Sequence, residues 1–201
     1  MARRTGRAAP LPVSFFRRPA AQVARDLLGT LLVTEVGGAR TVGRIVETEA
    51  YLGHVDPASH GFEYRRHARN VALYGPAGTW YVYLSYGVHW CCNLVCEGTG
   101  SGGAVLLRAL EPLEGQDVMA ARRGTPRPAL LCSGPGRLTQ ALGIDLALDG
   151  TAMRRSAARV LPGAPVPDEH VAAGPRIGIT KAAEWPLRFS ERGSRWLSRK
   201  A

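Results

Sequence analysis

The fold of this chain is organised around the stretch GTWYVYLSYGVHWCCNLV (78–95). Its β-branched and aromatic residues predict two strands that meet at a turn containing Gly87. Side chains alternate along a strand, so the first strand of the pair has two different faces. One face carries Tyr81, Tyr83 and Ser85, and the other carries Trp80, Val82, Leu84 and Tyr86.

Tyr86 precedes Gly87 and is therefore expected at the tip of this hairpin. An aromatic side chain at an exposed tip is badly placed for a core and well placed to wedge between stacked bases. The ordinary alternative is an aromatic-rich hairpin that belongs wholly to a core, and this stretch alone leaves that alternative open.

Composition favours a single basic domain. The chain has 201 residues, and 45% of them are hydrophobic, which suits one sizeable core. Its formal net charge is +10, from 24 Arg and two Lys against 16 acidic residues. Arginine makes forked contacts to phosphate, and a surface this basic attracts polyanions. A coding bias towards Ala, Gly, Arg and Pro would produce part of the same signal.

The four cysteines form no CxxC motif and no zinc-finger spacing with His; they are Cys91, Cys92, Cys96 and Cys132. We expect free, mostly buried thiols in a reducing compartment, with no metal and no cofactor. The apolar runs are too short to span a bilayer, and the first residues lack the apolar region of a signal peptide. A cytoplasmic protein, nucleoid-associated if bacterial and without membrane contact, is therefore expected.

Patterns of caps, breakers and alternation predict a disordered basic tail over 1–12 and one α+β domain over 13–201. Helices are predicted over 19–28 and 116–123, and a third follows Ser133 as its N-cap, with Leu138, Ala141 and Leu142 buried. Strands are predicted over 31–35, 41–51, 104–110, 176–180 and 187–190. Gly134, beside the third helix, could offer N–H groups to a phosphate or simply belong to a capped helix.

The strand GRIVETEAYLG (43–53) places Glu47, Glu49 and Tyr51 on one face. Two carboxylates two residues apart repel each other unless they are solvated, hydrogen-bonded or paired with Arg. In a cleft, such a pair can have its pKa values pushed apart, which suits acid–base chemistry. The solvated polar face of an edge strand is the ordinary alternative.

Two further features indicate a site. Residues 53–78 are too polar and too rich in Gly and Pro for a core, and a loop of this length is usually functional or disordered. Arg108 interrupts the apolar strand AVLLRAL (104–110). A buried arginine must reach solvent, a carboxylate or a ligand anion.

Taken together, several blocks resemble the 3-methyladenine (alkyladenine) DNA glycosylase family, over nearly the whole chain from about Pro19 to Trp196. They are RIVETEAYLG (44–53), ASH (58–60), RN (69–70), GTWYVYLSYGVHWCCN (78–93), LLRALEPLEG (106–115), LCSGPGRLTQALGI (131–144) and PLRFSERGSRW (186–196). The resemblance implies a single mixed domain with a curved, mainly antiparallel sheet, flanking short helices and a protruding hairpin that inserts into DNA. It also implies a monomer that acts on double-stranded DNA containing damaged purines.

Three residues match the family's reacting groups. Glu49 matches the carboxylate that activates the attacking water, and Arg108 matches the arginine that helps to position that water and the nucleotide phosphate. Tyr86 matches the wedge that replaces the flipped nucleotide.

Four more residues match the base pocket. Tyr51 and His60 match one wall, and Tyr83 matches the opposite wall. Asn93 matches the residue that crowds the position of the exocyclic amine of guanine.

The chain departs from the family at a few positions, which affects the expected substrate breadth but not the reaction. His67 stands where Thr is common, Leu73 and Tyr74 replace a Met-Phe pair, and Cys92 replaces Leu or Met.

The resemblance implies a monofunctional glycosylase that flips purines of the 3-methyladenine, 7-methylguanine or hypoxanthine type and hydrolyses the N-glycosidic bond, which starts base excision repair. A cationic alkylated purine leaves as a neutral base, so one carboxylate can suffice where most glycoside hydrolases need two. A non-catalytic module that binds damaged DNA is the main alternative. A metal-dependent nuclease is a weaker one, because only Glu47 and Glu49 form a clustered acidic pair near the proposed site.

Overall fold

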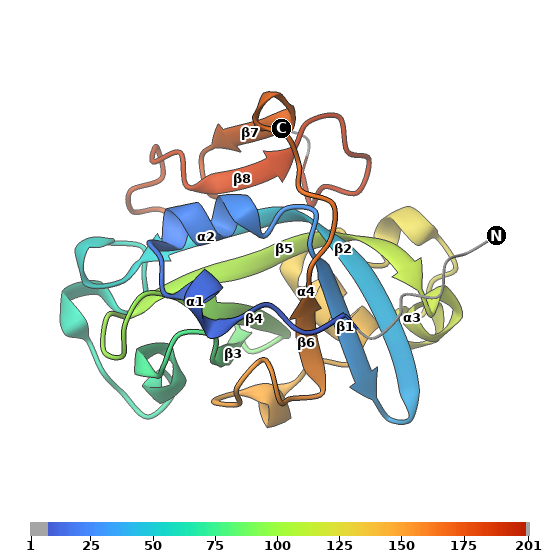
Figure 1. Cartoon of the computed structure of the whole chain (residues 1–201), viewed down its shortest axis with the longest axis horizontal. Coiled ribbons are helices and arrows are strands. Elements are labelled where there is room, and N and C mark those ends of the chain that lie inside the picture. Colours follow the sequence, from blue (N-terminus) through green and yellow to red (C-terminus); the bar gives the residue numbers. More distant parts are fainter. Residues whose placement is uncertain (1–7, 200–201) are drawn as a thin grey trace.

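The longest strand of the computed structural model, β2 (Ala39–Leu52), lies inside an eight-stranded sheet whose strand pairs are all antiparallel (Figure 1). The structure describes residues 8–199. The strands follow the order β3-β4-β5-β2-β1-β6, and β8 pairs with both β2 and β7. The other strands are β1 (Leu31–Val36), β3 (Trp80–Ser85), β4 (His89–Val95), β5 (Gly103–Glu114), β6 (Ala158–Leu161), β7 (Val171–Gly174) and β8 (Arg188–Glu191). This curled sheet with its short helices confirms the predicted α+β fold.

Short helices cover the sheet and close the core. They are α1 (Val13–Phe16), α2 (Ala20–Asp26), α3 (Gln116–Arg123) and α4 (Pro135–Leu142). Helix α2 packs on β2, where the Thr48 hydroxyl donates to the Ala24 carbonyl at 2.8 Å. The largest core side chain, Trp80, is fully buried and donates its indole N–H to the Ala158 carbonyl at 3.0 Å. Burial of each large apolar side chain stabilises the fold by about 1.5–3 kcal/mol.

Strand β2 changes partners along its length, and this places the two carboxylates. Its first half pairs with β1, whereas residues 47–49 pair with β8. Its register against β5 shifts between Ile45 and Glu47, and bulges of this kind re-aim side chains beside functional sites. Glu47 and Glu49 are both 0% exposed, so the alternative of a solvated edge strand is wrong.

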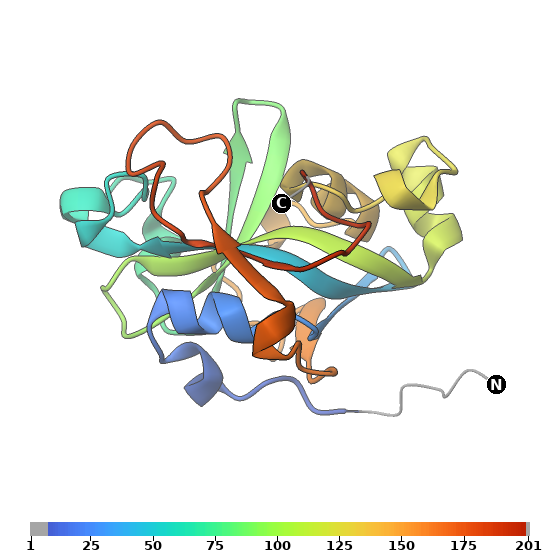
Figure 2. The same cartoon turned by 90° about the horizontal axis from the view of Figure 1, so that it is seen from above.

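The predicted hairpin is present and projects from the sheet (Figure 2). Its inner half belongs to the core through Trp80 and Val82, which are both buried. Its outer half ends at Tyr86, which is 90% exposed. Tyr86 has φ 50° and Gly87 has φ 71°, so a bulky side chain occupies a backbone conformation that favours glycine. The exposed tip is therefore confirmed, and a hairpin wholly within a core is excluded.

Several predicted boundaries were wrong for local reasons. β5 continues past residue 110 to Glu114, because Pro112 pairs with Gly43 at a register shift. Gly134, not Ser133, is the N-cap of α4, and the Ser133 hydroxyl instead accepts a hydrogen bond from Arg137 at 3.0 Å. The predicted strand over 176–180 is irregular, and the strand lies earlier, at β7.

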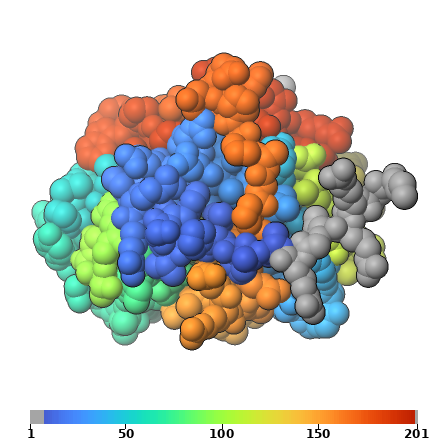
Figure 3. Space-filling model, in the orientation of Figure 1, coloured from blue at the N-terminus to red at the C-terminus, as the bar shows by residue number. Residues whose placement is uncertain are grey.

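The chain is already ordered before the predicted domain boundary. Leu11 is buried in the core and donates its N–H to the Val160 carbonyl at 2.8 Å, so the ordered domain begins before residue 13. In Figure 3 this N-terminal segment, coloured blue, crosses the molecule beside the orange segment that follows β6. The rest of the predicted tail, residues 1–7, lies outside the described residues.

All four cysteines are free and buried, as predicted. Within residues 8–199, no helix is long and apolar enough to cross a membrane. The same part of the chain contains no group of three or more His, Cys, Asp or Glu side chains that could hold a metal ion.

Candidate active site

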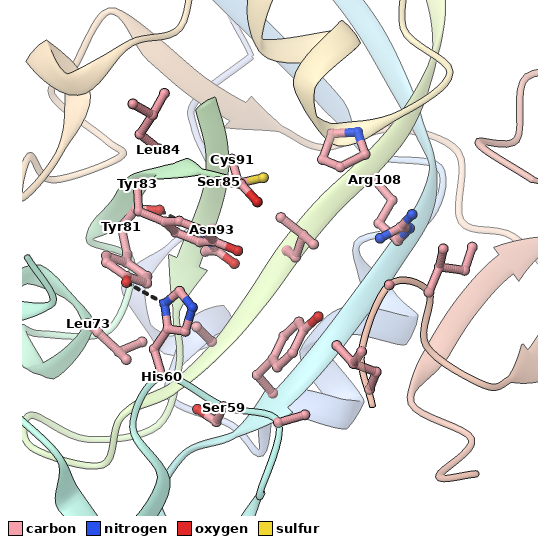
Figure 4. A pocket seen from close by; sticks show the side chains of 18 of the residues that line it. Ser59, His60, Leu73, Tyr81, Tyr83, Leu84, Ser85, Cys91, Asn93 and Arg108 are labelled. Atoms are coloured by element: carbon pink, nitrogen blue, oxygen red, sulfur yellow. Dashed lines mark hydrogen bonds between the residues drawn. The ribbon is translucent and has the colours of Figure 1, made fainter. Parts of the chain in front are cut away.

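A cavity of about 510 Å³ lies where five parts of the chain meet (Figure 4). These parts are the hairpin, the loop over 53–78, the paired strands β2 and β5, the start of α4 at Pro135, and the segment 177–179. Six of the seven predicted site residues line this cavity: Tyr51, His60, Tyr83, Tyr86, Asn93 and Arg108. The seventh, Glu49, lies directly behind the lining and is hydrogen-bonded to three of the lining residues.

Glu49 is fully buried and accepts three hydrogen bonds. The Tyr51 hydroxyl donates to Oε2 at 3.0 Å, Arg108 donates to Oε2 at 3.2 Å, and the Ile177 N–H donates to Oε1 at 2.7 Å. Burial raises the pKa of Glu49, and the Arg108 charge and the two other donors offset part of that rise. A carboxylate with a raised pKa and fixed donors is suited to accept a proton.

Glu47 has a different environment, although it faces the same side of β2. Arg188 donates to its Oε1 at 2.6 Å, and Arg108 donates to the same oxygen at 3.3 Å. The Ser198 N–H and hydroxyl donate to its two oxygens at 2.6 and 2.8 Å. Glu47 therefore ties β5, β8 and the C-terminal segment together, and it binds Arg108 through a different nitrogen from the one that binds Glu49.

Tyr51 lies beside these charged residues and is held by two of its neighbours. Its hydroxyl binds Glu49, and the guanidinium of Arg176 lies 4.7 Å from the centre of its ring. Burial and the neighbouring Glu49 carboxylate raise the pKa of Tyr51, so the phenol stays protonated and remains a hydrogen-bond donor.

Aromatic residues form the other side of the cavity. The His60 ring lies edge-on to Tyr83, with ring centres 4.5 Å apart, and its Nδ1 is 2.7 Å from the Tyr81 hydroxyl. Partial burial lowers the pKa of His60, which favours the neutral imidazole. The prediction that His60 shares a wall with Tyr51, opposite Tyr83, was therefore wrong. His60 and Tyr83 contact each other beside the hairpin (Figure 4), whereas the Tyr51 hydroxyl binds Glu49.

Two buried side chains hold the loop that carries His60. Asn70 donates to the carbonyls of His60 and Arg65 at 3.1 and 2.9 Å and accepts from the His67 N–H at 2.9 Å. The Tyr74 hydroxyl donates to the same Arg65 carbonyl at 2.7 Å. Phenylalanine could not make this bond, so the departure at residue 74 adds a restraint on the pocket loop.

Asn93 and the adjacent cysteines occupy neighbouring positions on β4. Asn93 is 4% exposed, lines the cavity and donates to the Tyr81 carbonyl at 3.1 Å. Cys91 also lines the cavity, whereas Cys92 points into the hydrophobic core. The departure at Cys92 therefore changes core packing and not the cavity lining.

Sequence reasoning missed the residues that support the site from behind. Arg176 and Arg188 were assigned only to strands, Ser198 was given no role, and Asp56 was noted only as part of the loop. The argument applied to Arg108 would have identified Arg176, because Arg176 also stands next to apolar residues in a predicted strand.

Comparison with known proteins identifies the relatives of this chain. Residues 14–195 match the family described as methylpurine-DNA glycosylase. A protein from Methanoculleus marisnigri is 50% identical over 193 residues, which cover 94% of this chain and 99% of the relative. A protein from Rhizobium meliloti is 52% identical over 190 residues, which cover 94% of this chain and 96% of the relative. Both are provisionally named 3-methyladenine DNA glycosylase.

Proposed function

Because this chain belongs to the methylpurine-DNA glycosylase family, and is therefore a hydrolase of N-glycosyl bonds in DNA, we propose that it flips alkylated or deaminated purines out of duplex DNA and releases them. The proposed substrates are of the 3-methyladenine, 7-methylguanine and hypoxanthine type, and the names of the relatives support the first of these. One observation carries the proposal. A fully buried carboxylate, Glu49, lies directly behind an aromatic cavity of about 510 Å³.

Tyr86 acts first, by entering the base stack as the target nucleotide leaves it. Extrusion of a base costs a few kcal/mol, and least where a lesion already weakens pairing. The 90% exposure and positive φ of Tyr86 support this role, since a strained residue at an exposed tip is otherwise a cost to the fold.

The extruded base then stacks between Tyr51 on one side and the contacting pair His60 and Tyr83 on the other. Aromatic stacking on a base contributes about 1–3 kcal/mol, which offsets much of the cost of extrusion. Asn93 lies deeper, between the strands, and would exclude bases that carry an additional amine at that edge.

Glu49 acts as the general base in this proposal. Water reaching the carboxylate from the cavity loses a proton to Glu49 as it attacks the sugar, and the carboxylate also stabilises the developing positive charge on the sugar. Arg108 positions the water and the nucleotide phosphate. Its second bond, from Nε to Glu47, helps to keep it in place beside Glu49.

The test is a panel of duplexes that each carry one defined lesion. We expect free base to be released from at least one lesion, with the strand intact and no loss of rate when a chelator is present. Binding without release from any lesion would favour the binding module, and chelator-sensitive strand cutting would favour the nuclease. The expectations of a monomer and of a cytoplasmic location stay predictions.

A further inference from the structure

Arg176 is 4% exposed, although it lies in an irregular segment between β7 and β8. A buried guanidinium needs compensating partners. One terminal nitrogen donates to Oδ1 of Asp56 at 2.8 Å, and the other donates to Oδ2 of Asp56 and to the Ala50 carbonyl, the latter at 3.0 Å. Such a two-nitrogen fork fixes orientation as well as charge. The pair joins two segments that lie 120 residues apart in the sequence.

Asp56 is itself held rigidly. It is 0% exposed and accepts hydrogen bonds from the N–H groups of Leu52 at 3.1 Å and Ala58 at 3.0 Å. Burial alone would raise the pKa of Asp56, but the bonds from Arg176 and from the two N–H groups hold it below its ordinary value. A carboxyl group with a lowered pKa contributes stability above its unfolded pKa and loses it only as the pH falls through the folded pKa. The ion pair is therefore intact throughout the neutral range.

Arg176 does not line the cavity, but it adjoins two residues that do. Its guanidinium lies 4.7 Å from the centre of the Tyr51 ring, and Tyr51 does line the cavity. The next residue, Ile177, lines the cavity and donates its N–H to Glu49 at 2.7 Å. One anchored side chain thus supports a base-stacking wall and a donor to the proposed catalytic carboxylate.

We propose that Arg176, locked by Asp56, is a positioning residue that holds the Tyr51 ring against the flipped base and the Ile177 N–H against Glu49. This inference rests on the proposed function, because it assigns the roles of Tyr51 and Glu49 from it. Arg176 is not a catalytic residue, since Tyr51 and Ile177 line the cavity and it does not. Its effect reaches the reaction only through them.

The proposal has a signature in the pH dependence of base release. The titratable and charged groups around Glu49 are Arg108 on β5, Glu47 and Tyr51 on β2, Cys91 on β4, and Arg188, which is the cross-strand partner of Glu49 on β8. Because Glu49 must be ionised to accept a proton, release falls as the pH drops through its pKa. The Ile177 N–H stabilises the ionised form. Displacing that N–H therefore raises the pKa of Glu49 and moves the acidic limb of the profile to higher pH.

The decisive variant is Arg176→Lys, which keeps the charge but loses the fork and the planar contact with Tyr51. We expect single-turnover release to fall by roughly 10- to 100-fold, because small misplacements of reacting groups reduce rates on this scale. The acidic limb of the pH profile should move to higher pH. Affinity for undamaged duplex should not change, because that affinity comes from surface contacts with phosphate. Arg44→Lys is the matched control. Arg44 lies on β2 and, like Arg176, is ion-paired, in its case with Glu111 and Glu191. The Arg44→Lys variant should leave both the rate of release and the acidic limb unchanged.

A folded Arg176→Lys protein with wild-type rate and limb would overturn the inference. If that variant does not fold, the double variant Asp56→Asn/Arg176→Gln replaces the buried charges with a neutral pair, and the same two readouts decide. A wild-type rate and limb in the double variant would mean that the pair serves stability alone. Failure of the wild-type enzyme to release any base would instead count against the proposed function, which keeps the two failures distinct.

Discussion

The two sides of the cavity differ in what they bury. On the side formed by β2, β5 and the segment 176–179, the groups are charged, buried and each held by several partners. On the side formed by the hairpin and the His60 loop, the groups are aromatic and uncharged, and the outermost of them, Tyr86, is 90% exposed. The buried charges and the exposed Tyr86 both depart from the usual distribution, in which charges face water and aromatic rings are buried.

The two sides differ in how the fold compensates for these unfavourable placements. Buried charges are tolerated because carboxylates and guanidinium groups from distant segments satisfy one another, so that side is rigid. Within residues 8–199, no ion pair or side-chain hydrogen bond holds the exposed tyrosine, which directly follows the ladder between β3 and β4. We infer that chemistry requires the rigid side, whereas insertion into DNA requires the projecting side.

The largest expected effect separates Glu49 from Glu47 on the rigid side. Glu49→Gln should reduce base release by about 10²- to 10⁴-fold, the usual contribution of a general base, while binding to abasic-site DNA persists. Glu47→Gln should reduce release less but lower the Tm more, because it leaves Arg188 and Arg108 short of a partner, and breaking a buried pair costs about 3–5 kcal/mol. Single-turnover rates and thermal melts of both variants make the comparison.

Either of two results would contradict this view. Near-wild-type release by Glu49→Gln would remove Glu49 as the base. Equal losses of rate at both positions would mean that the two carboxylates act as one unit.

The second effect tests the projecting side. Tyr86→Ser should reduce flipping of a fluorescent lesion base by roughly 5- to 150-fold, since stacking contributes about 1–3 kcal/mol. Non-specific binding to DNA should change less. Tyr64→Ser is a matched control, because Tyr64 is also an exposed tyrosine with positive φ, but it does not line the cavity. Unchanged flipping in Tyr86→Ser would rule out the wedge.

Much of both sides could be predicted from the sequence, because short-range rules govern it. Alternation placed Glu47, Glu49 and Tyr51 on one face, and Gly87 placed Tyr86 at the tip. The errors involve groups whose partners are distant in sequence. Arg176 was assigned to a strand because nothing local indicates Asp56, and the contact of His60 with Tyr83 depends on how Asn70 folds the intervening loop.

The third effect concerns Asn93, at the inner end of the aromatic side. Asn93→Ser shortens the side chain and removes its bond to the Tyr81 carbonyl, which opens space at the depth where a guanine amine would lie. We expect the ratio of rates on guanine-type and adenine-type lesions to rise by about tenfold, the scale on which a small steric change alters discrimination. Equal changes on both lesion types would refute the assignment of Asn93 to specificity.

A smaller effect is expected from Tyr74→Phe, which deletes only the hydroxyl that binds the Arg65 carbonyl. Loss of one such bond costs about 0.5–1.5 kcal/mol. The His60 loop should therefore open roughly 2- to 12-fold more often, measured as faster amide exchange over 60–67 and faster tryptic cleavage after Arg65 or Arg66. Tyr64→Phe is the control on the same loop. Identical exchange in wild type and Tyr74→Phe would show that the hydroxyl does not restrain the loop.

The last expected effect is zero, and it tests whether the two sides account for the reaction. A glycosylase that also cuts the strand normally attacks the sugar with an amine and forms a Schiff base, for which a lysine is the usual choice. No lysine is among the residues that line the cavity, and Lys181, the only lysine within residues 8–199, is exposed just beyond the lining segment 177–179.

Arginine cannot serve as this nucleophile, because it stays protonated. Water activated by Glu49 is therefore the expected nucleophile, and the product is an unbroken abasic site. Borohydride added during the reaction should trap no protein–DNA adduct with either wild type or Lys181→Ala, and both should release base at the same rate. A trapped adduct that disappears in Lys181→Ala would place a nucleophile outside both sides of the cavity and make the enzyme bifunctional. An adduct that persists in Lys181→Ala would point to Lys200 or the terminal amine, and it would overturn the water mechanism equally.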